Sequence, residues 1–156
     1  MYVAVIGAGQ CDQRTAQVAY EVGRLVALKG AILVCGGLGG VMNAAAQGAR
    51  EAGGLTVGIL PSETRTGASK FIDVAIPSGL GEARNALIAR AADVVIAIGG
   101  GYGTLSEIGL ALKMGKPVIG LGTWEIGHGG QRDPGIIVAG TPQTAIEKAF
   151  QLTSGI

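Results

Sequence analysis

A glutamate and an arginine beside glycine-rich segments are the residues of this sequence best suited to chemistry. Glu107 lies three residues after Thr104, so its carboxylate is expected one turn into a helix. There it could bind ribose hydroxyls or stabilise a developing oxocarbenium ion. The segment Thr104-Leu105-Ser106-Glu107 also matches a capping box, in which both side chains only satisfy the first amides of the helix. Both interpretations of Glu107 stay open at this point.

Arg84 opens a predicted helix and is the second candidate. A guanidinium group meets a phosphate through two parallel N–H donors, so Arg84 could clamp a phosphorylated ligand. The simpler alternative is an ion pair on the protein surface.

Three other side chains are weaker candidates. His128 is the only histidine, and no partner residues around it suggest a metal site or a catalytic triad, so no metal is expected. Cys35 ends an apolar run and is expected to be a small core residue. Trp124 could stack on a flat ring or simply pack a loop. Cys11 and Cys35 lack the spacing of a zinc site and favour a reducing compartment, the cytoplasm.

Three glycine clusters each lie between a predicted strand and a predicted helix. They are Gly7-Ala8-Gly9, Gly36-Gly37-Leu38-Gly39-Gly40 and Gly99-Gly100-Gly101-Tyr102-Gly103-Thr104. In open α/β sheets, ligands bind beyond the carboxyl ends of the strands, where helix N-termini present unpaired N–H groups. Three such loops at one sheet edge predict a phosphate-binding groove. No metal or other cofactor is required for this arrangement.

Alternating strand and helix patterns predict the elements that position these loops. The alternation indicates one doubly wound, Rossmann-like α/β domain with a mostly parallel sheet of about seven strands. The predicted strands are Tyr2–Ile6, Ala31–Cys35, Leu55–Leu60, Phe71–Ile76, Asp93–Ile98, Pro117–Leu121 and Ile136–Ala139. Helices are predicted around Ala16–Val26 and over Val41–Ala52, Gly81–Ala92, Gly103–Met114 and Thr141–Leu152, with surface loops at Pro61–Lys70 and Gly127–Gly135.

Composition narrows the possible functions. The chain has 156 residues, 48% of them hydrophobic and 15% charged, which suits one domain over residues 1–156. The formal net charge of +1 is scattered, so a nucleic-acid partner is not expected. The chain starts without a basic leader or a long apolar stretch, so neither a secretory signal nor a membrane partner is expected.

Two common nucleotide-binding motifs are absent. The dinucleotide fingerprint fails because Asp12 stands where a third glycine should follow Gly7 and Gly9, and no acidic residue follows Cys35 to bind a ribose hydroxyl. The sequence also lacks the G-x-x-x-x-G-K-[ST] loop of P-loop NTPases. Ordinary NAD binding and P-loop chemistry are therefore not expected.

Longer motifs resemble a known superfamily. Gly100-Gly101-Tyr102-Gly103-Thr104-Leu105-Ser106-Glu107, Arg84-Asn85 and Gly36-Gly37-Leu38-Gly39-Gly40-Val41-Met42 resemble the Lonely Guy-like proteins, often mislabelled "lysine decarboxylase". The likeness runs from the first strand to about Gly122. One branch of this superfamily, the phosphoribohydrolases, releases cytokinin bases from riboside monophosphates. Resemblance to that branch implies that Arg84 and Glu107 are catalytic. No residue set supports the pyridoxal chemistry of a lysine decarboxylase.

Two departures favour another branch of that superfamily. The hydrolase motif normally reads P-G-G-x-G-T with a lysine after the arginine, whereas Gly99 and Asn85 occupy those positions here. The Arg-Asn pair and the short chain look more like the molybdenum cofactor carrier proteins, which hold a pterin phosphate and form homo-oligomers. A homodimer or homotetramer is therefore expected. The ligand-binding residues expected on these grounds are Gly7, Gly9, Gly36, Gly37, Gly39, Gly40, Met42, Arg84, Asn85, Gly100, Gly101, Gly103, Thr104 and Glu107.

Three functions remain open from the sequence. The first is a binding or carrier protein for a phosphorylated, nucleotide-like small molecule, with molybdenum cofactor (molybdopterin) as cargo. The second is a nucleoside 5′-monophosphate phosphoribohydrolase, an N-glycosidase in which Glu107 stabilises charge at the anomeric carbon or orients water. The third is a sensor that reports a nucleotide-like signal to a partner protein.

Overall fold

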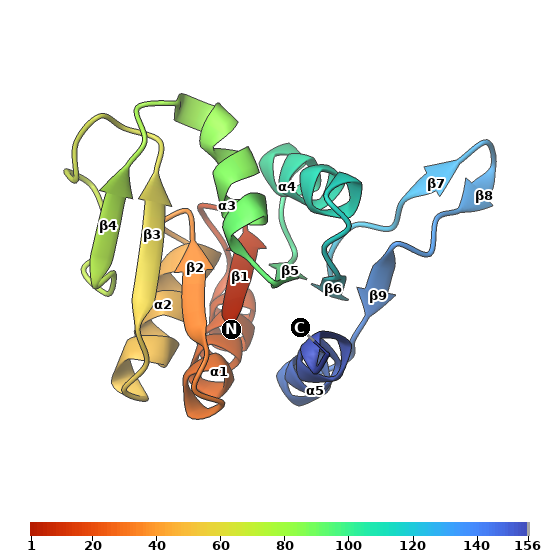
Figure 1. The fold of residues 1–156 in the computed structure, drawn as a ribbon, viewed down its shortest axis with the longest axis horizontal. Coiled ribbons are helices and arrows are strands. Elements are labelled where there is room, and N and C mark those ends of the chain that lie inside the picture. The colour runs from red at the N-terminus through yellow and green to blue at the C-terminus, as the bar shows by residue number, and fades with distance from the viewer. Residues whose placement is uncertain (156) are drawn as a thin grey trace.

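The main sheet is parallel throughout and has seven strands in the order β4-β3-β2-β1-β5-β6-β9. This is a computed structural model that describes residues 1–155, so residue 156, the end of the predicted domain, lies outside it. Figure 1 shows the strands side by side with β1 near the middle. Their bounds are β1 Tyr2–Gly7, β2 Ile32–Cys35, β3 Thr56–Leu60, β4 Val74–Pro77, β5 Val94–Ile98, β6 Val118–Leu121 and β9 Ile136–Val138. The predicted Rossmann-like fold class is confirmed.

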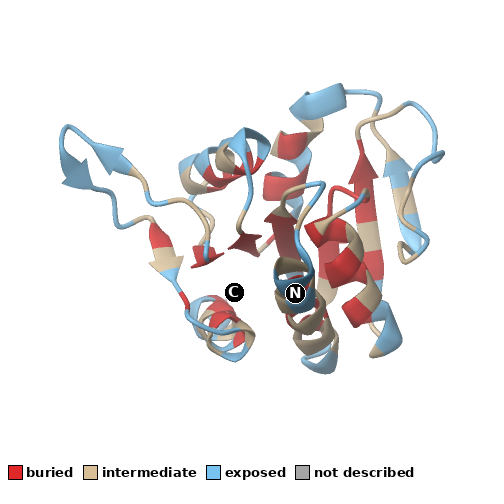
Figure 2. Cartoon of the chain, turned by 180° about the vertical axis from the view of Figure 1, so that it is seen from behind, coloured by how far each residue is buried: buried red, intermediate tan, exposed pale blue. Residues whose placement is uncertain are grey.

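Helices cover both faces of the sheet. One face packs against α1 Gln13–Leu28, α2 Val41–Glu51 and α5 Pro142–Thr153, and the other against α3 Asn85–Ala91 and α4 Tyr102–Lys113. Because both faces are covered, the central strands are continuous apolar runs, and Figure 2 shows them as buried. Among the described residues, no helix combines the length and apolar character that a bilayer crossing needs.

Glycines inside α1 and α2 allow these two helices to pack at backbone distance. A Cβ atom on Gly23 would lie 1.9 Å from the main-chain oxygen of Ala45, and one on Gly48 would lie 2.0 Å from that of Tyr20. No side chain fits in such a space. The two glycines therefore have a packing role, which fixes α2 beside α1 and so places the loops before both helices next to each other.

The strand predicted at Phe71–Ile76 begins later in the structure than expected. The structure places β4 at Val74–Pro77, because the residues before it are held in a turn by side chains. Thr56 Oγ1 donates a hydrogen bond to the main-chain oxygen of Phe71 at 2.6 Å, and the Asp73 carboxylate accepts one from the Thr56 amide at 3.0 Å. The Asp73 amide also donates to the main-chain oxygen of Thr56 at 3.2 Å, so this segment is joined to β3 just before β4 begins.

The predicted surface loop Pro61–Lys70 lies along the outer edge of the sheet. Arg65 Nε donates to the main-chain oxygen of Ala75 in β4 at 3.1 Å, and the Ser69 amide donates to that of Gly37 at 2.8 Å. The Arg65 bond occupies a carbonyl of the edge strand that would otherwise be free to pair with another chain.

The predicted helix Gly81–Ala92 is divided into two parts. A 3₁₀ turn, η1 Gly81–Arg84, comes first, and α3 begins only at Asn85. Gly81 has a φ of +57°, in the left-handed region, so regular α-helix cannot begin there. The division places Arg84 at the junction of the two helical segments.

The predicted loop Gly127–Gly135 contains a small hairpin that the glycine-rich sequence did not predict. Residues Gly127–His128 (β7) pair with Gln131–Arg132 (β8) in an antiparallel, two-stranded ribbon. Figure 1 shows this ribbon reaching away from the main sheet. Gly129 and Gly130, at φ +59° and +78°, make the tight turn between its strands. His128 is exposed on this ribbon.

Candidate functional site

A pocket of about 310 Å³ opens beyond the carboxyl ends of β1 and β2. Strands β2, β3 and β4 follow one another on one side of β1, and β5, β6 and β9 follow one another on the other side. The pocket therefore lies where the strand order reverses. This is the place where open α/β sheets bind ligands. Four segments of the chain line it: the end of β1 with the loop after it, the β2–α2 connection, η1 with α3, and the first turns of α4. The lining residues are Val5, Ile6, Gly7, Ala8, Gly9, Gly36, Met42, Glu82, Arg84, Asn85, Gly101, Gly103, Thr104 and Glu107.

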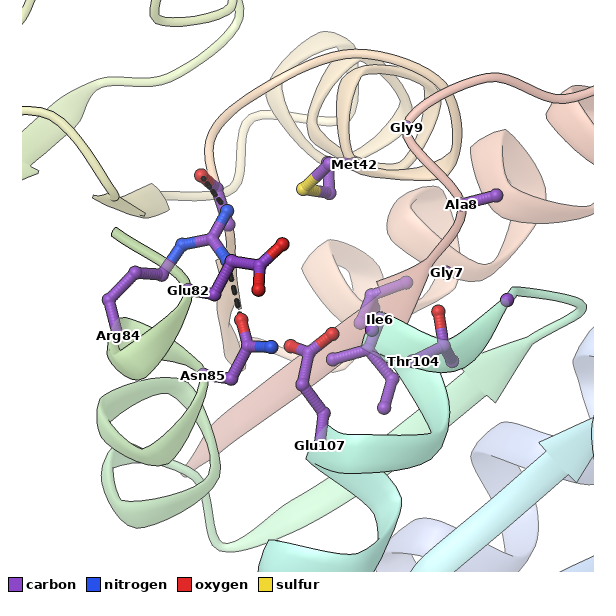
Figure 3. Close-up of a pocket in the computed structure, with 14 residues that line it drawn as sticks. Ile6, Gly7, Ala8, Gly9, Met42, Glu82, Arg84, Asn85, Thr104 and Glu107 are labelled. Atoms are coloured by element: carbon purple, nitrogen blue, oxygen red, sulfur yellow. Dashed lines mark hydrogen bonds between the residues drawn. The ribbon is translucent and has the colours of Figure 1, made fainter. Parts of the chain in front are cut away.

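Glu107 projects from α4 into the centre of this pocket (Figure 3). The residue is 9% exposed, and no hydrogen bond from any described residue reaches its carboxylate. Burial raises the pKa of Glu107 from its usual 4.5 to about 7, although the positive charge of Arg84 acts in the opposite direction. A buried acid without a donor holds its proton more tightly, because the charged form has lost its water. Glu107 is thus poised to change protonation state near neutral pH.

The predicted capping box at Thr104–Glu107 is wrong. Helix α4 begins at Tyr102 with Gly101 as its N-cap, so Thr104 is already the third helical residue and cannot cap. The glycine N-cap carries no side chain, and α4 has no side-chain cap, unlike α1 and α5. Its first amides therefore lack intrahelical partners and lie at the pocket wall formed by Gly101, Gly103 and Thr104. The helix dipole adds partial positive charge there.

Arg84 reaches the pocket from the η1–α3 junction and is fixed by main-chain oxygens. Its Nε donates to the carbonyl of Ile59 at 2.9 Å, and Nη2 makes a longer contact of 3.5 Å with that of Gly36. Within residues 1–155 it forms no ion pair, so the alternative of a surface ion pair is wrong. The Arg84 side chain lines the pocket (Figure 3).

Asn85 connects Arg84 to the neighbouring helix. Its Oδ1 accepts a hydrogen bond from Arg84 Nη1 at 2.5 Å, while its Nδ2 donates to Ser106 Oγ at 3.0 Å. Ser106 Oγ in turn donates to the main-chain oxygen of Gly103 at 2.7 Å. A lysine at position 85 has no acceptor atom and could not make the first of these bonds. Asn85 therefore positions Arg84 relative to the N-terminus of α4.

Most of the predicted site residues come together in the pocket lining, and four glycines do not. Gly37, Gly39, Gly40 and Gly100 lie outside the lining. Gly40 has a φ of +59°, and a Cβ there would lie 2.2 Å from the main-chain oxygen of Ala8. That same oxygen accepts the Val41 amide at 3.0 Å, so the first helical amide of α2 is already paired. The first helical amide of α2 therefore has a main-chain partner, whereas α4 begins at the pocket wall.

Sequence reasoning missed four lining residues: Val5, Ile6, Ala8 and Glu82. Ala8 could have been included, since it stands between Gly7 and Gly9 in a loop already assigned to the site. Glu82 is exposed on η1, two residues before Arg84, and the predicted regular helix gave no reason to turn it inward. Val5 and Ile6 belong to β1 and form the apolar floor of the pocket.

The weaker candidates are not among the lining residues of the pocket. Cys35 is fully buried, and this burial raises the pKa of its thiol to about 12, so it is an unreactive core residue. The Trp124 ring packs against the Tyr102 ring at 5.6 Å between centroids, outside the pocket lining. Within the described part of the chain, no cluster of three or more His, Cys, Asp or Glu side chains is arranged to hold a metal ion.

Comparison with protein families gives one match that covers nearly the whole chain. The model of the SLOG cluster4 family matches residues 1–146. An uncharacterized protein of Archaeoglobus fulgidus is 51% identical over 121 residues, which make up 78% of this chain and 80% of that protein.

The chain also resembles solved structures, among them the following two. The molybdenum cofactor binding protein of the phototrophic bacterium Rippkaea orientalis superimposes with a TM-score of 0.88 at 39% identity, covering 97% of this chain and 96% of that one. The molybdenum cofactor carrier protein of Chlamydomonas reinhardtii gives a TM-score of 0.86 at 35% identity, covering 98% of both chains.

Proposed function

This chain belongs to the SLOG cluster4 family, and from that premise we propose that it binds and carries a phosphorylated pterin, the molybdenum cofactor. The observation that carries the proposal is the convergence of three features on one pocket: the uncapped N-terminus of α4, the guanidinium of Arg84 and the buried carboxylate of Glu107. These features provide separate places for an anionic group and for a group that donates hydrogen bonds.

The anionic end of the cargo binds at the N-terminus of α4. Glycine at positions 101 and 103 leaves open space where a Cβ atom would otherwise stand, so a phosphate can approach the backbone amides closely. Arg84 adds a full positive charge on the opposite wall, and Asn85 holds it in position. Charge-assisted hydrogen bonds of this kind are about twice as strong as neutral ones.

The remainder of the cargo occupies the space between the apolar floor and Glu107. The volume of about 310 Å³ lies at the lower end of the range of small-molecule sites, so part of the cargo extends beyond the mouth. Affinity comes mainly from backbone amides that exist before the ligand arrives, and little reorganisation is needed. The two solved relatives bind or carry molybdenum cofactor, which supports the same class of cargo here.

Hydrolysis of a nucleoside 5′-monophosphate is the second candidate, and Glu107 is the observation that favours it. A carboxyl group whose pKa is raised to about 7 can give or take a proton at neutral pH, as a general acid or base must. In that reaction the N-terminus of α4 and Arg84 would bind the phosphate and so orient the ribose. The Glu107 carboxylate would stabilise positive charge at the anomeric carbon.

Native mass spectrometry of the purified protein with molybdopterin, AMP or GMP distinguishes the two candidates. The carrier proposal predicts a saturable complex with molybdopterin and no free base after incubation with either nucleotide. Release of base that Glu107→Gln abolishes would establish the hydrolase and overturn the carrier proposal. Failure of every phosphorylated probe to bind would overturn both.

A further inference from the structure

We propose that Glu107 selects ligands whose ring presents two adjacent N–H donors, the 2-amino-4-oxopyrimidine edge that pterins and guanine share. This inference rests on the proposed function, because it assumes that a phosphorylated ring compound occupies the pocket. It adds the chemical class of that ring and names the residue that reads it.

The first argument is the unused hydrogen-bonding capacity of Glu107. The pocket is lined by two carboxylates, Glu82 and Glu107, and by the single cation Arg84. Glu82 is exposed to water, whereas Glu107 is nine-tenths buried and receives no donor from the described residues. In its ionised form Glu107 repels an anionic group and accepts hydrogen bonds, so a ligand part that supplies N–H donors fits next to it.

The second argument is geometric. Both oxygens of a carboxylate can accept from two parallel N–H groups, the arrangement seen when a guanidinium meets a carboxylate. The N–H at position 3 and the 2-amino group of a pterin, or the equivalent N1 and N2 groups of guanine, have the same parallel pair. Such a pair favours the ionised carboxylate and so offsets the burial that raises the pKa of Glu107.

The third argument concerns the walls around the carboxylate. Ile6 lies beside Glu107, and Met42 lies on the other side of the pocket (Figure 3). Both side chains are almost completely buried, at 2% and 9% exposed, so their surfaces toward the ligand are apolar. A methionine sulfur packs favourably on aromatic rings. These walls suit a flat heterocycle better than a ribose diol, which would need polar groups around it.

Isothermal titration calorimetry with GMP and IMP tests the inference, since IMP lacks only the 2-amino group. We expect the wild-type protein to bind GMP at least about tenfold more tightly than IMP, the usual effect of one hydrogen bond to a charged group. Glu107→Gln should bring the ratio close to one, because its amide offers one neutral acceptor oxygen where the carboxylate offers two charged ones. Glu147→Gln is the matched control: it makes the same substitution at an exposed position of α5 outside the pocket lining and should leave the ratio unchanged.

Each other outcome counts against the inference in a distinguishable way. Equal binding of GMP and IMP would overturn the ring assignment and leave phosphate binding intact. Weaker binding of 2′-deoxy-GMP, with GMP and IMP equal, would assign Glu107 to the ribose instead. Binding of molybdopterin without binding of GMP would likewise overturn the inference, whereas no binding of any of these probes would overturn the proposed function as well. If both bind, the tighter one identifies the source of the ring.

Discussion

Trp124 donates a hydrogen bond from its indole Nε1 to the main-chain oxygen of Gly101 at 3.0 Å. The only tryptophan of the chain is therefore attached to the N-cap of α4, although its ring lies outside the pocket. Tyr102, the next residue, packs against the same ring. The fluorescent side chain of this protein therefore contacts the first residues of α4.

We expect ligand binding to alter the fluorescence of Trp124. A phosphate at the N-terminus of α4 brings negative charge next to Gly101 and changes the electric field at the indole. The measurement is a titration of tryptophan emission with GMP or molybdopterin. Gly103→Ala, which should weaken binding, is expected to shift the fluorescence response to higher ligand concentration; an unshifted response in that variant would place the ligand elsewhere.

Gly103→Ala should impair binding without impairing folding. Gly103 has no positive φ and open space where a Cβ would stand, and alanine is the better helix former. The new methyl group would stand at the pocket wall, where the phosphate is expected to approach. We expect thermal stability to be equal or higher by up to about 1 kcal/mol, and ligand affinity to fall at least about tenfold.

Gly109→Ala is the matched control for that variant. Gly109 lies on the same helix, also with open space around its Cβ position, and does not line the pocket. It should gain stability and keep its ligand affinity. Loss of binding in both variants would show that the helix as a whole, and not its N-terminus, determines affinity.

Replacing Arg84 by lysine should weaken phosphate binding although the charge is kept. A lysine cannot reproduce the fork that reaches Ile59, Asn85 and the pocket together. We expect affinity for GMP to fall about tenfold or more and stability to fall by about 1 kcal/mol, because the Ile59 carbonyl loses a donor. Calorimetry and urea unfolding measure the two effects. Arg90→Lys, at an exposed position of α3, is the control and should change neither.

Burial of Glu107 should make the ligand-free protein less stable as the pH rises. Its pKa is raised in the folded state from 4.5 to about 7, so folding favours the protonated form. That contribution is fully present below about pH 4.5 and is lost as the pH rises through about 7, with a magnitude of about 3 kcal/mol. Glu107→Gln removes it. Urea unfolding at pH 5 and pH 8 should show a smaller difference for the variant; identical differences would contradict the prediction.

The fold class could be predicted from the sequence because it depends on local patterns. Continuous apolar runs such as Val94–Ile98 mark strands buried on both faces, and glycine clusters at their ends mark tight turns into helices. Short side-chain interactions at element ends are less visible. The bonds of Thr56 and Asp73 make β4 begin later than predicted, and the left-handed conformation of Gly81 divides the predicted helix before Asn85. The observed boundaries therefore differ from the predicted ones by a few residues.

The sequence by itself determined which loops reach the carboxyl edge of the sheet and which charged residues, Arg84 and Glu107, stand beside them. Only the tertiary structure decided what those residues do. Arg84 meets the carbonyl of Ile59, 25 residues earlier, and Glu107 becomes buried without a donor. Gly40 supports the loop before α1, while Gly101 opens onto the pocket. The physical reason is that burial, pairing and access depend on segments brought together by packing across the sheet, and spacing along one segment does not encode these contacts.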